Sequence, residues 1–174
     1  MKNLLLAAAL AALSITVRAQ PLPGFKASGL FDEQQTVIED SPPGTRILIN
    51  APMHGFGKDD RVLLVLYALP NGNTIEQTTG NKLKEGDDWH YDIQQTGAPT
   101  RFLRKAIAGR TVVVAYLEND RKSWPAWNAA TTDYRDQVRQ IVEEVTAMFA
   151  PWDPELVLNG HSGGGRFIFS YIDA

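Results

Sequence analysis

The stretch that decides the fold is Leu156 to Ala174, which reads LVLNGHSGGGRFIFSYIDA. A short apolar run, LVLN, leads into Gly160-His161-Ser162-Gly163-Gly164, and an apolar, helix-compatible segment follows. This order of strand, sharp turn and helix gives G-x-S-x-G its chemical meaning, because the turn lifts the serine hydroxyl above the sheet edge. Side chains at 160 and 164 would collide with the neighbouring strand and helix. Ser162 is therefore the candidate nucleophile.

The backbone after Ser162 supplies the second part of this interpretation. A helix that starts there offers free N–H groups and a positive dipole end, so the N–H of Gly163 is a candidate oxyanion donor. The structural alternative is a glycine-rich turn that only packs tightly. A phosphate-binding turn is less consistent with the residues, since no Lys-Ser/Thr pair follows and the G-x-G-x-x-G spacing is absent.

The chain before this stretch alternates between strand-like and helix-like patterns. Unbroken apolar runs at 45–50, 61–68, 111–117 and 156–159 predict strands that are covered on both faces. Stripes with helical spacing at 100–108 and 133–150 predict helices, and a third helix is expected after Ser162. The predicted fold is α/β, with a mostly parallel sheet flanked by helices. Residues 20–44 are expected to form an extended lead-in.

The N-terminus and the composition indicate an exported protein. Residues 1–19 resemble a signal peptide, with Lys2, an apolar stretch from Leu4 to Leu13, and a cleavage site after Ala19; an uncleaved anchor is the alternative. The expected location is secreted or periplasmic, without disulfides because there is no cysteine. The net charge of −3 and the lack of a basic run argue against nucleic acid. No apolar run is long enough for a stable membrane span.

The GHSGG motif and the order of elements over residues 45–174 resemble the α/β-hydrolase superfamily, in particular secreted bacterial esterases of the polyhydroxybutyrate-depolymerase-like type. The resemblance implies a first strand near Gln35 to Ile38 and a second oxyanion donor in the loop after the third strand. That loop holds Leu69 or Asn71 as the donor, because Pro70 has no N–H. The family's HGGG form of the loop is absent, and Pro70-Asn71-Gly72 is equally well explained as a turn.

The resemblance also implies a triad in the order serine, acid, histidine, and no histidine follows Ser162. His161 is expected to pack or orient the turn, while His54 and His90 are expected in surface loops. The domain 45–174 is therefore expected to be incomplete, with the acid and the base beyond residue 174. The strand ending at Asn159 would then form an exposed apolar edge, so the chain alone is predicted to be poorly soluble or partly unfolded, and inactive.

Two further segments carry candidate chemistry. Trp124 and Trp127, at a strand carboxyl end, are candidates for a substrate pocket or for a hydrophobic lid over the core. The acidic segment 84–92 has metal-ligand residue types without a recognised spacing, so an exposed loop is expected there, and no metal site is predicted. The charges at Glu118, Asp120 and Arg121 are expected to be solvated.

Together these patterns predict a serine hydrolase that cleaves a carboxylic ester through an acyl-enzyme on Ser162, without a cofactor. The substrate would be a small-molecule or polymeric ester; peptide or thioester cleavage would use the same groups. The alternative from another class is a secreted, non-catalytic binding protein on the same scaffold.

Overall fold

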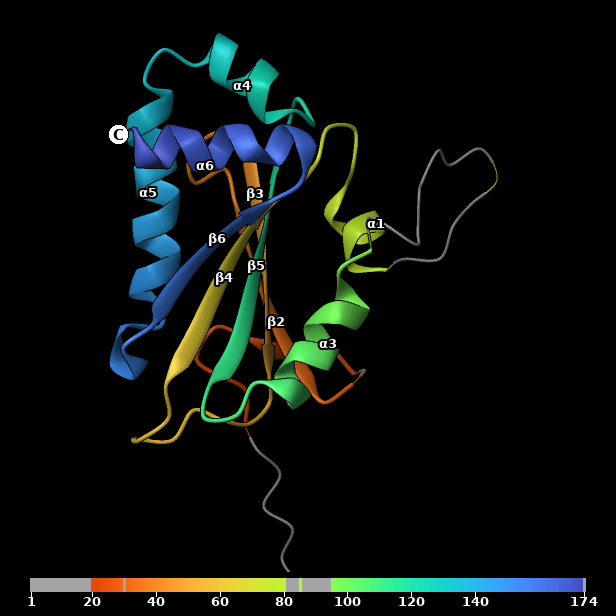
Figure 1. Ribbon diagram of the computed structural model, residues 1–174, viewed down its shortest axis with the longest axis vertical. Helices are drawn as coiled ribbons and strands as arrows, with labels where there is room; N and C mark the ends of the chain where they lie inside the picture. The colour runs from red at the N-terminus through yellow and green to blue at the C-terminus, as the bar shows by residue number, and fades with distance from the viewer. Residues whose placement is uncertain (1–19, 30, 81–84, 86–94, 174) are drawn as a thin grey trace, which may run out of the picture.

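The structure is a computed structural model that describes residues 20–29, 31–80, 85 and 95–173. These residues form one mixed sheet with helices on both of its faces (Figure 1). The strands are β1 (Lys26–Ala27), β2 (Glu33–Glu39), β3 (Thr45–Pro52), β4 (Val62–Ala68), β5 (Thr111–Asn119) and β6 (Glu155–Gly160). The signal-peptide prediction for residues 1–19 and the segment 86–94 with His90 lie outside the described residues.

The described helices are α1 (Ile75–Thr79), α3 (Gly97–Ala106), α4 (Trp124–Ala130), α5 (Tyr134–Ala147) and α6 (Gly165–Ile172), with single 3₁₀ turns η1 (Ala150–Trp152) and η2 (Ser162–Gly164). Helices α3, α5 and α6 correspond to the three predicted ones. Helix α4 was not expected, although its sequence carries a start signal. The Ser123 hydroxyl accepts a hydrogen bond from the Ala126 N–H at 3.3 Å, and a proline occupies the first turn.

The prediction of a mostly parallel sheet is wrong. The strand order is β1-β2-β3-β5-β4-β6, and the pairs β1–β2, β2–β3 and β3–β5 are antiparallel. Only β4–β5 and β4–β6 are parallel. The sheet is therefore mixed, with an antiparallel half and a parallel half that meet at β5.

The lengths of the connections explain this difference. A parallel crossover needs about a dozen residues or more, usually including a helix. Residues 40–44 and 53–61 are too short for that and contain no helix. The chain therefore reverses direction after β2 and again after β3. The apolar runs at 45–50, 61–68 and 111–117 are largely buried, as predicted, whereas the run at 156–159 in β6 is partly exposed. Burial alone does not set strand direction.

Two apolar layers cover the two faces of the sheet. On one face, α4, α5 and α6 pack against a large cluster that includes Leu64 and Leu66. The stripe predicted for α5 is confirmed, and its buried members are Val138, Ile141, Val142 and Val145. On the other face, α1 contributes Ile75 to a smaller cluster built around Tyr67 and Tyr116 of the sheet. These layers hold the carboxyl ends of β4, β5 and β6 side by side.

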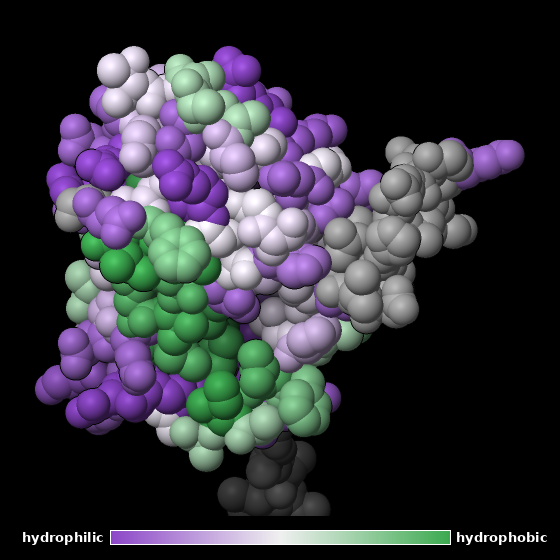
Figure 2. Space-filling model, turned by 45° about the horizontal axis from the view of Figure 1, so that its top comes forward, coloured by the Kyte–Doolittle hydropathy of each residue, from purple (hydrophilic) through white to green (hydrophobic). Residues whose placement is uncertain are grey.

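Strand β6 forms an edge of the sheet, since its partner among the described strands is β4 alone. Figure 2 shows an apolar strip on the side of the molecule where β6 and α6 lie. Val157 of β6 is 38% exposed, and Phe169 and Ile172 of α6 are more than half exposed. Within the described residues, the helices are too short or too polar to cross a lipid bilayer.

Candidate functional site at the turn after β6

Ser162 occupies a strained turn between β6 and α6. Its φ of +53° lies in the left-handed region, which costs a non-glycine residue about 1–2 kcal/mol. The turn is closed by a hydrogen bond from the Gly164 N–H to the His161 carbonyl at 2.9 Å. The side chain of Ser162 is exposed, and its hydroxyl has no hydrogen-bond partner among the described residues. The backbone thus presents this hydroxyl to solvent at the carboxyl end of the strand.

The flanking glycines are required by close packing. A Cβ on Gly164 would lie 2.1 Å from the Ala68 carbonyl oxygen at the end of β4. A Cβ on Gly160 would lie 2.8 Å from the Gly164 carbonyl carbon. Gly160 and Ala68 are also paired in the sheet, so the turn is seated directly on the neighbouring strand. The steric role predicted for residues 160 and 164 is thereby explained atom by atom.

The loop after β4 packs against Gly163. The carboxamide of Asn71 occupies the space that a side chain at 163 would need, since a Cβ there would lie within 2.9 Å of its nitrogen and closer still to its oxygen. The N–H groups of Gly163 and Asn71 make no hydrogen bonds in the described part of the chain. Both backbone donors are therefore free, and the Asn71 side chain brings the loop after β4 into contact with Gly163.

The backbone N–H of Leu69, the other predicted oxyanion donor of this loop, is already hydrogen-bonded. Its N–H donates to the Leu117 carbonyl at 3.1 Å, and its side chain is buried. The same loop is tied down by the Gly72 N–H, which donates to the Lys122 carbonyl at 2.8 Å. Asn71 therefore remains as the donor candidate, because it lies between two anchored positions and is itself exposed.

Glu118, a charge that the sequence analysis expected to be solvated, fixes the start of α1. The Glu118 carboxylate accepts a hydrogen bond from the Ile75 N–H at 2.9 Å, and its side chain is only 12% exposed. Burial raises the pKa of Glu118 above its usual value. Arg46 bonds Glu76 at 2.6 Å, which lowers the pKa of that carboxyl. Glu118 is thus a structural carboxylate rather than the solvated charge expected from sequence.

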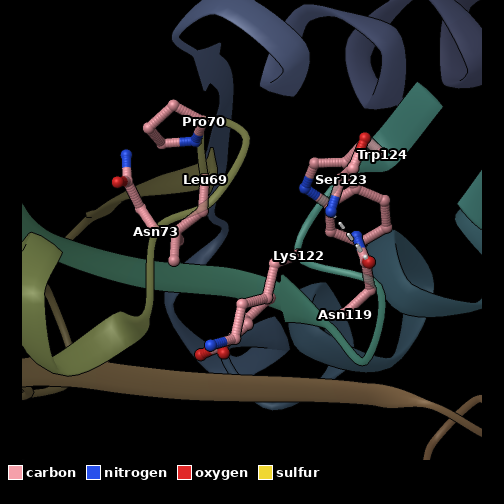
Figure 3. A pocket seen from close by; sticks show the side chains of 8 residues that line it. Leu69, Pro70, Asn73, Asn119, Lys122, Ser123 and Trp124 are labelled. Carbon is pink, nitrogen blue, oxygen red and sulfur yellow. Dashed lines mark hydrogen bonds between the residues drawn. The ribbon is translucent and has the colours of Figure 1, made fainter. Parts of the chain in front are cut away.

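A narrow crevice, with no room for a water molecule, lies between the loop after β4 and the loop after β5 (Figure 3). Two of its lining residues, Asn73 and Trp124, have buried N–H groups, on Nδ2 and Nε1, without a partner in the residues described. A buried donor without a partner costs about 1–3 kcal/mol.

Trp124 and Trp127 are core residues. They are 2% and 3% exposed, their rings meet edge to face at 5.4 Å, and Trp124 contacts the Phe167 ring of α6 at 4.8 Å. Trp124 lines the crevice between the two loops, whereas Trp127 lines none of the pockets described. The arrangement matches the alternative interpretation, a hydrophobic cover over the core.

The described histidines do not form a base for Ser162. His54 follows β3, which runs antiparallel to β5, so His54 lies beyond the opposite end of the strands from Ser162. Its Nε2 is 3.2 Å from the Asp32 carboxylate. Both side chains of that pair are 68% exposed. His161 precedes the serine directly and is exposed. Among residues 20–29, 31–80, 85 and 95–173, no group of three His, Asp or Glu side chains is arranged to hold a metal ion.

Comparison with known proteins assigns no family. The chain matches no protein-family model, and no curated protein is significantly similar to it.

Proposed function

We propose that this protein is a serine esterase that cleaves a carboxylic ester through an acyl-enzyme on Ser162. The observation that carries the proposal is the left-handed backbone of Ser162, which holds an exposed, unpartnered hydroxyl beside the free Gly163 N–H. Backbone strain at a single residue is typical of functional sites, because a purely structural role gives no reason to retain the strain. The resemblance to α/β-hydrolases remains part of this proposal and depends on the GHSGG turn.

The reaction follows from these groups. The Ser162 oxygen attacks the ester carbonyl carbon, and the carbonyl oxygen becomes an oxyanion between the N–H groups of Gly163 and Asn71. Collapse of this intermediate expels the alcohol and leaves an acyl-enzyme, which water then hydrolyses to the acid. The base that takes the serine proton, and the acid that orients it, are proposed to come from residues beyond 174. The substrate is a small-molecule or polymeric ester, and the protein acts outside the cytoplasm.

The test uses the natural full-length protein and a fluorophosphonate probe, which labels activated serines. We expect labelling and hydrolysis of a p-nitrophenyl ester, and we expect Ser162→Ala to abolish both. Ser41→Ala is the matched control, because the Ser41 hydroxyl is already bonded to Glu144 at 2.8 Å; it should label like the unmodified protein. Labelling that survives Ser162→Ala would refute the nucleophile. A complete lack of labelling in the folded protein would favour the non-catalytic binding protein.

A further inference from the structure

A second concave feature lies away from Ser162, on the sheet face that carries α1 and α3. It is an open groove of about 710 Å³, within the usual range for small-molecule sites. The residues that matter for its chemistry are Phe31, Gln35, Arg101, Phe102 and Lys105. Gln35 and Arg101 also line a polar recess of about 20 Å³, which has room for one water molecule.

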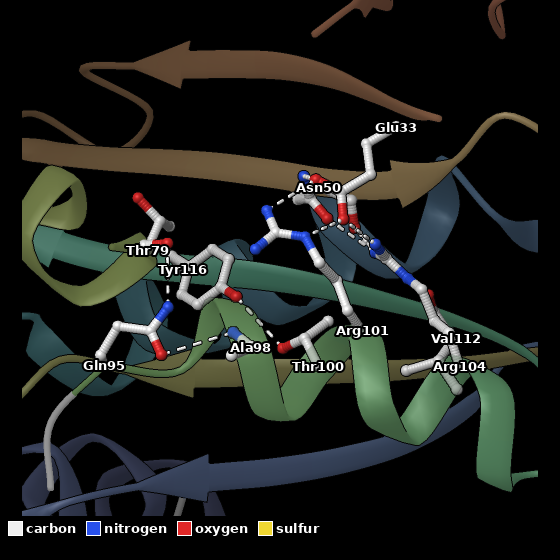
Figure 4. A network of polar contacts seen from close by, with 10 residues as sticks. All are labelled: Glu33, Asn50, Thr79, Gln95, Ala98, Thr100, Arg101, Arg104, Val112 and Tyr116. Atoms are coloured by element: carbon white, nitrogen blue, oxygen red, sulfur yellow. Dashed lines mark hydrogen bonds and ion pairs between the residues drawn. The ribbon is translucent and has the colours of Figure 1, made fainter. Parts of the chain in front are cut away.

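The groove has a surplus of positive charge. Arg101 donates to the buried Glu33 carboxylate through Nε at 2.9 Å and Nη2 at 3.1 Å (Figure 4). Arg104 donates to the same carboxylate at 2.8 Å, so two cations share one anion. The Nη1 group of Arg101 and the Lys105 ammonium have no partner in the part of the chain that the structure describes. Glu76, which also lines the groove, is paired with Arg46.

Two aromatic rings are exposed at the same place. Phe31 is 66% exposed, and Phe102 on α3 is 69% exposed. Phe31 also has a φ of +57°, a left-handed conformation that is rare for a bulky residue. Its ring lies under the Arg101 guanidinium, 3.8 Å from ring centre to Cζ. Phe31 therefore destabilises the folded protein in two ways, through its left-handed backbone and through its solvent-exposed ring. Such backbone outliers cluster at ligand sites.

From this combination we infer that the groove binds an aromatic carboxylate. The ring of the ligand would contact Phe31 and Phe102, and its carboxylate would accept hydrogen bonds from Arg101 Nη1 and Lys105 Nζ. Arg101 is suited to this role because Glu33 already fixes its guanidinium plane, so little conformational entropy is lost on binding. The inference is independent of esterase activity, since none of these residues belongs to the turn after β6.

Sodium benzoate is the probe that tests the charge and the ring together. Calorimetric titration of the folded protein should give saturable binding with a Kd of about 1 mM or below. Benzyl alcohol, which keeps the ring, and acetate, which keeps the charge, should each bind at least about tenfold more weakly. No saturation by benzoate up to about 20 mM, or equal binding of benzyl alcohol, would overturn the inference.

Variants locate the binding and separate it from folding. Phe31→Gly removes a ring and relieves the left-handed backbone, so the protein should be at least as stable, while benzoate binding falls at least about tenfold. Lys105→Gln should weaken binding about threefold to tenfold, through the loss of one charge. Arg139→Gln is the matched control, an exposed charge on α5, and should bind like the unmodified protein. Unchanged affinity in both groove variants would rule out this groove as the site.

Discussion

Gly164→Ala should be one of the most damaging single-methyl substitutions in this chain. The φ and ψ of Gly164, −60° and −25°, suit any residue, so the cost is entirely steric. The added Cβ would lie 2.1 Å from the Ala68 oxygen and 3.2 Å from the Leu69 oxygen, where about 3.4 Å is the usual lower limit. Both oxygens belong to backbone at the end of a central strand. The clash can be relieved only if the whole turn moves by about 1 Å.

The expected cost follows from that rigidity. Overpacking a rigid site costs about 1–3 kcal/mol, and a backbone-to-backbone clash belongs at the upper end. Gly165→Ala is the matched control, because it adds the same methyl group one residue later, where nothing lies within 4 Å. Gly165 is the first residue of α6, and alanine favours a helix more than glycine does, so Gly165→Ala should stabilise the protein by about 0.5–1 kcal/mol. The two neighbouring variants should therefore differ by about 2–4 kcal/mol.

Urea unfolding followed by tryptophan fluorescence measures this difference. With a slope of about 2 kcal/mol/M, the midpoints of the two variants should differ by about 1–2 M urea. The turn's movement should also slow fluorophosphonate labelling of Ser162 by about 100-fold in Gly164→Ala, because it displaces the Gly163 N–H. Midpoints within about 0.2 M of each other would refute the claim that the turn is seated on β4.

Three other substitutions test the fold and the site. Trp124→Ala should destabilise the protein by about 3–5 kcal/mol, measured by urea unfolding, because the ring packs on Phe167; a change in KM with unchanged stability would instead indicate a substrate pocket. Glu118→Gln should change the pH dependence of stability. Burial raises the pKa of Glu118 in the folded protein above its usual value, so ionisation of this carboxyl disfavours folding. Stability relative to Glu118→Gln should therefore fall as pH rises from the usual pKa of a glutamate through the raised pKa; a parallel pair of pH profiles would contradict this. Val157→Lys should reduce self-association in sedimentation experiments, because a charge blocks pairing at the β6 edge; unchanged association would show that the edge is not the contact.

The elements that sequence predicted well are those whose signals are local. The stripe of α5 and the turn at Gly160 to Gly164 are set by residues within a few positions of one another. Helix α4 was not predicted even though Ser123 and Pro125 form a recognisable helix start, because the two tryptophans were considered only as a substrate pocket or a hydrophobic lid. The steric need for glycine at 160 and 164 was also readable, since a strand, a turn and a helix must meet there.

The candidate site was only partly predictable, because its second half comes from another loop. The sequence offered Leu69 and Asn71 as equal donors. Only the hydrogen bond from Leu69 to Leu117 separates them, and it joins residues far apart along the chain. The structural role of Glu118 was missed for the same reason, as its partners are Ile75 and Arg46.

The sequence by itself determined most of the strands, the buried stripe of α5 and the position of Ser162 in a glycine-rich turn. These properties depend on backbone preferences and on the spacing of apolar residues, which act over one or two turns of chain. The tertiary structure decided the direction of the strands, because the direction of each strand relative to its neighbours depends on the path that the connecting segment takes back to the sheet. It also brought Phe31 beneath Arg101, a contact between distant segments that no local pattern encodes.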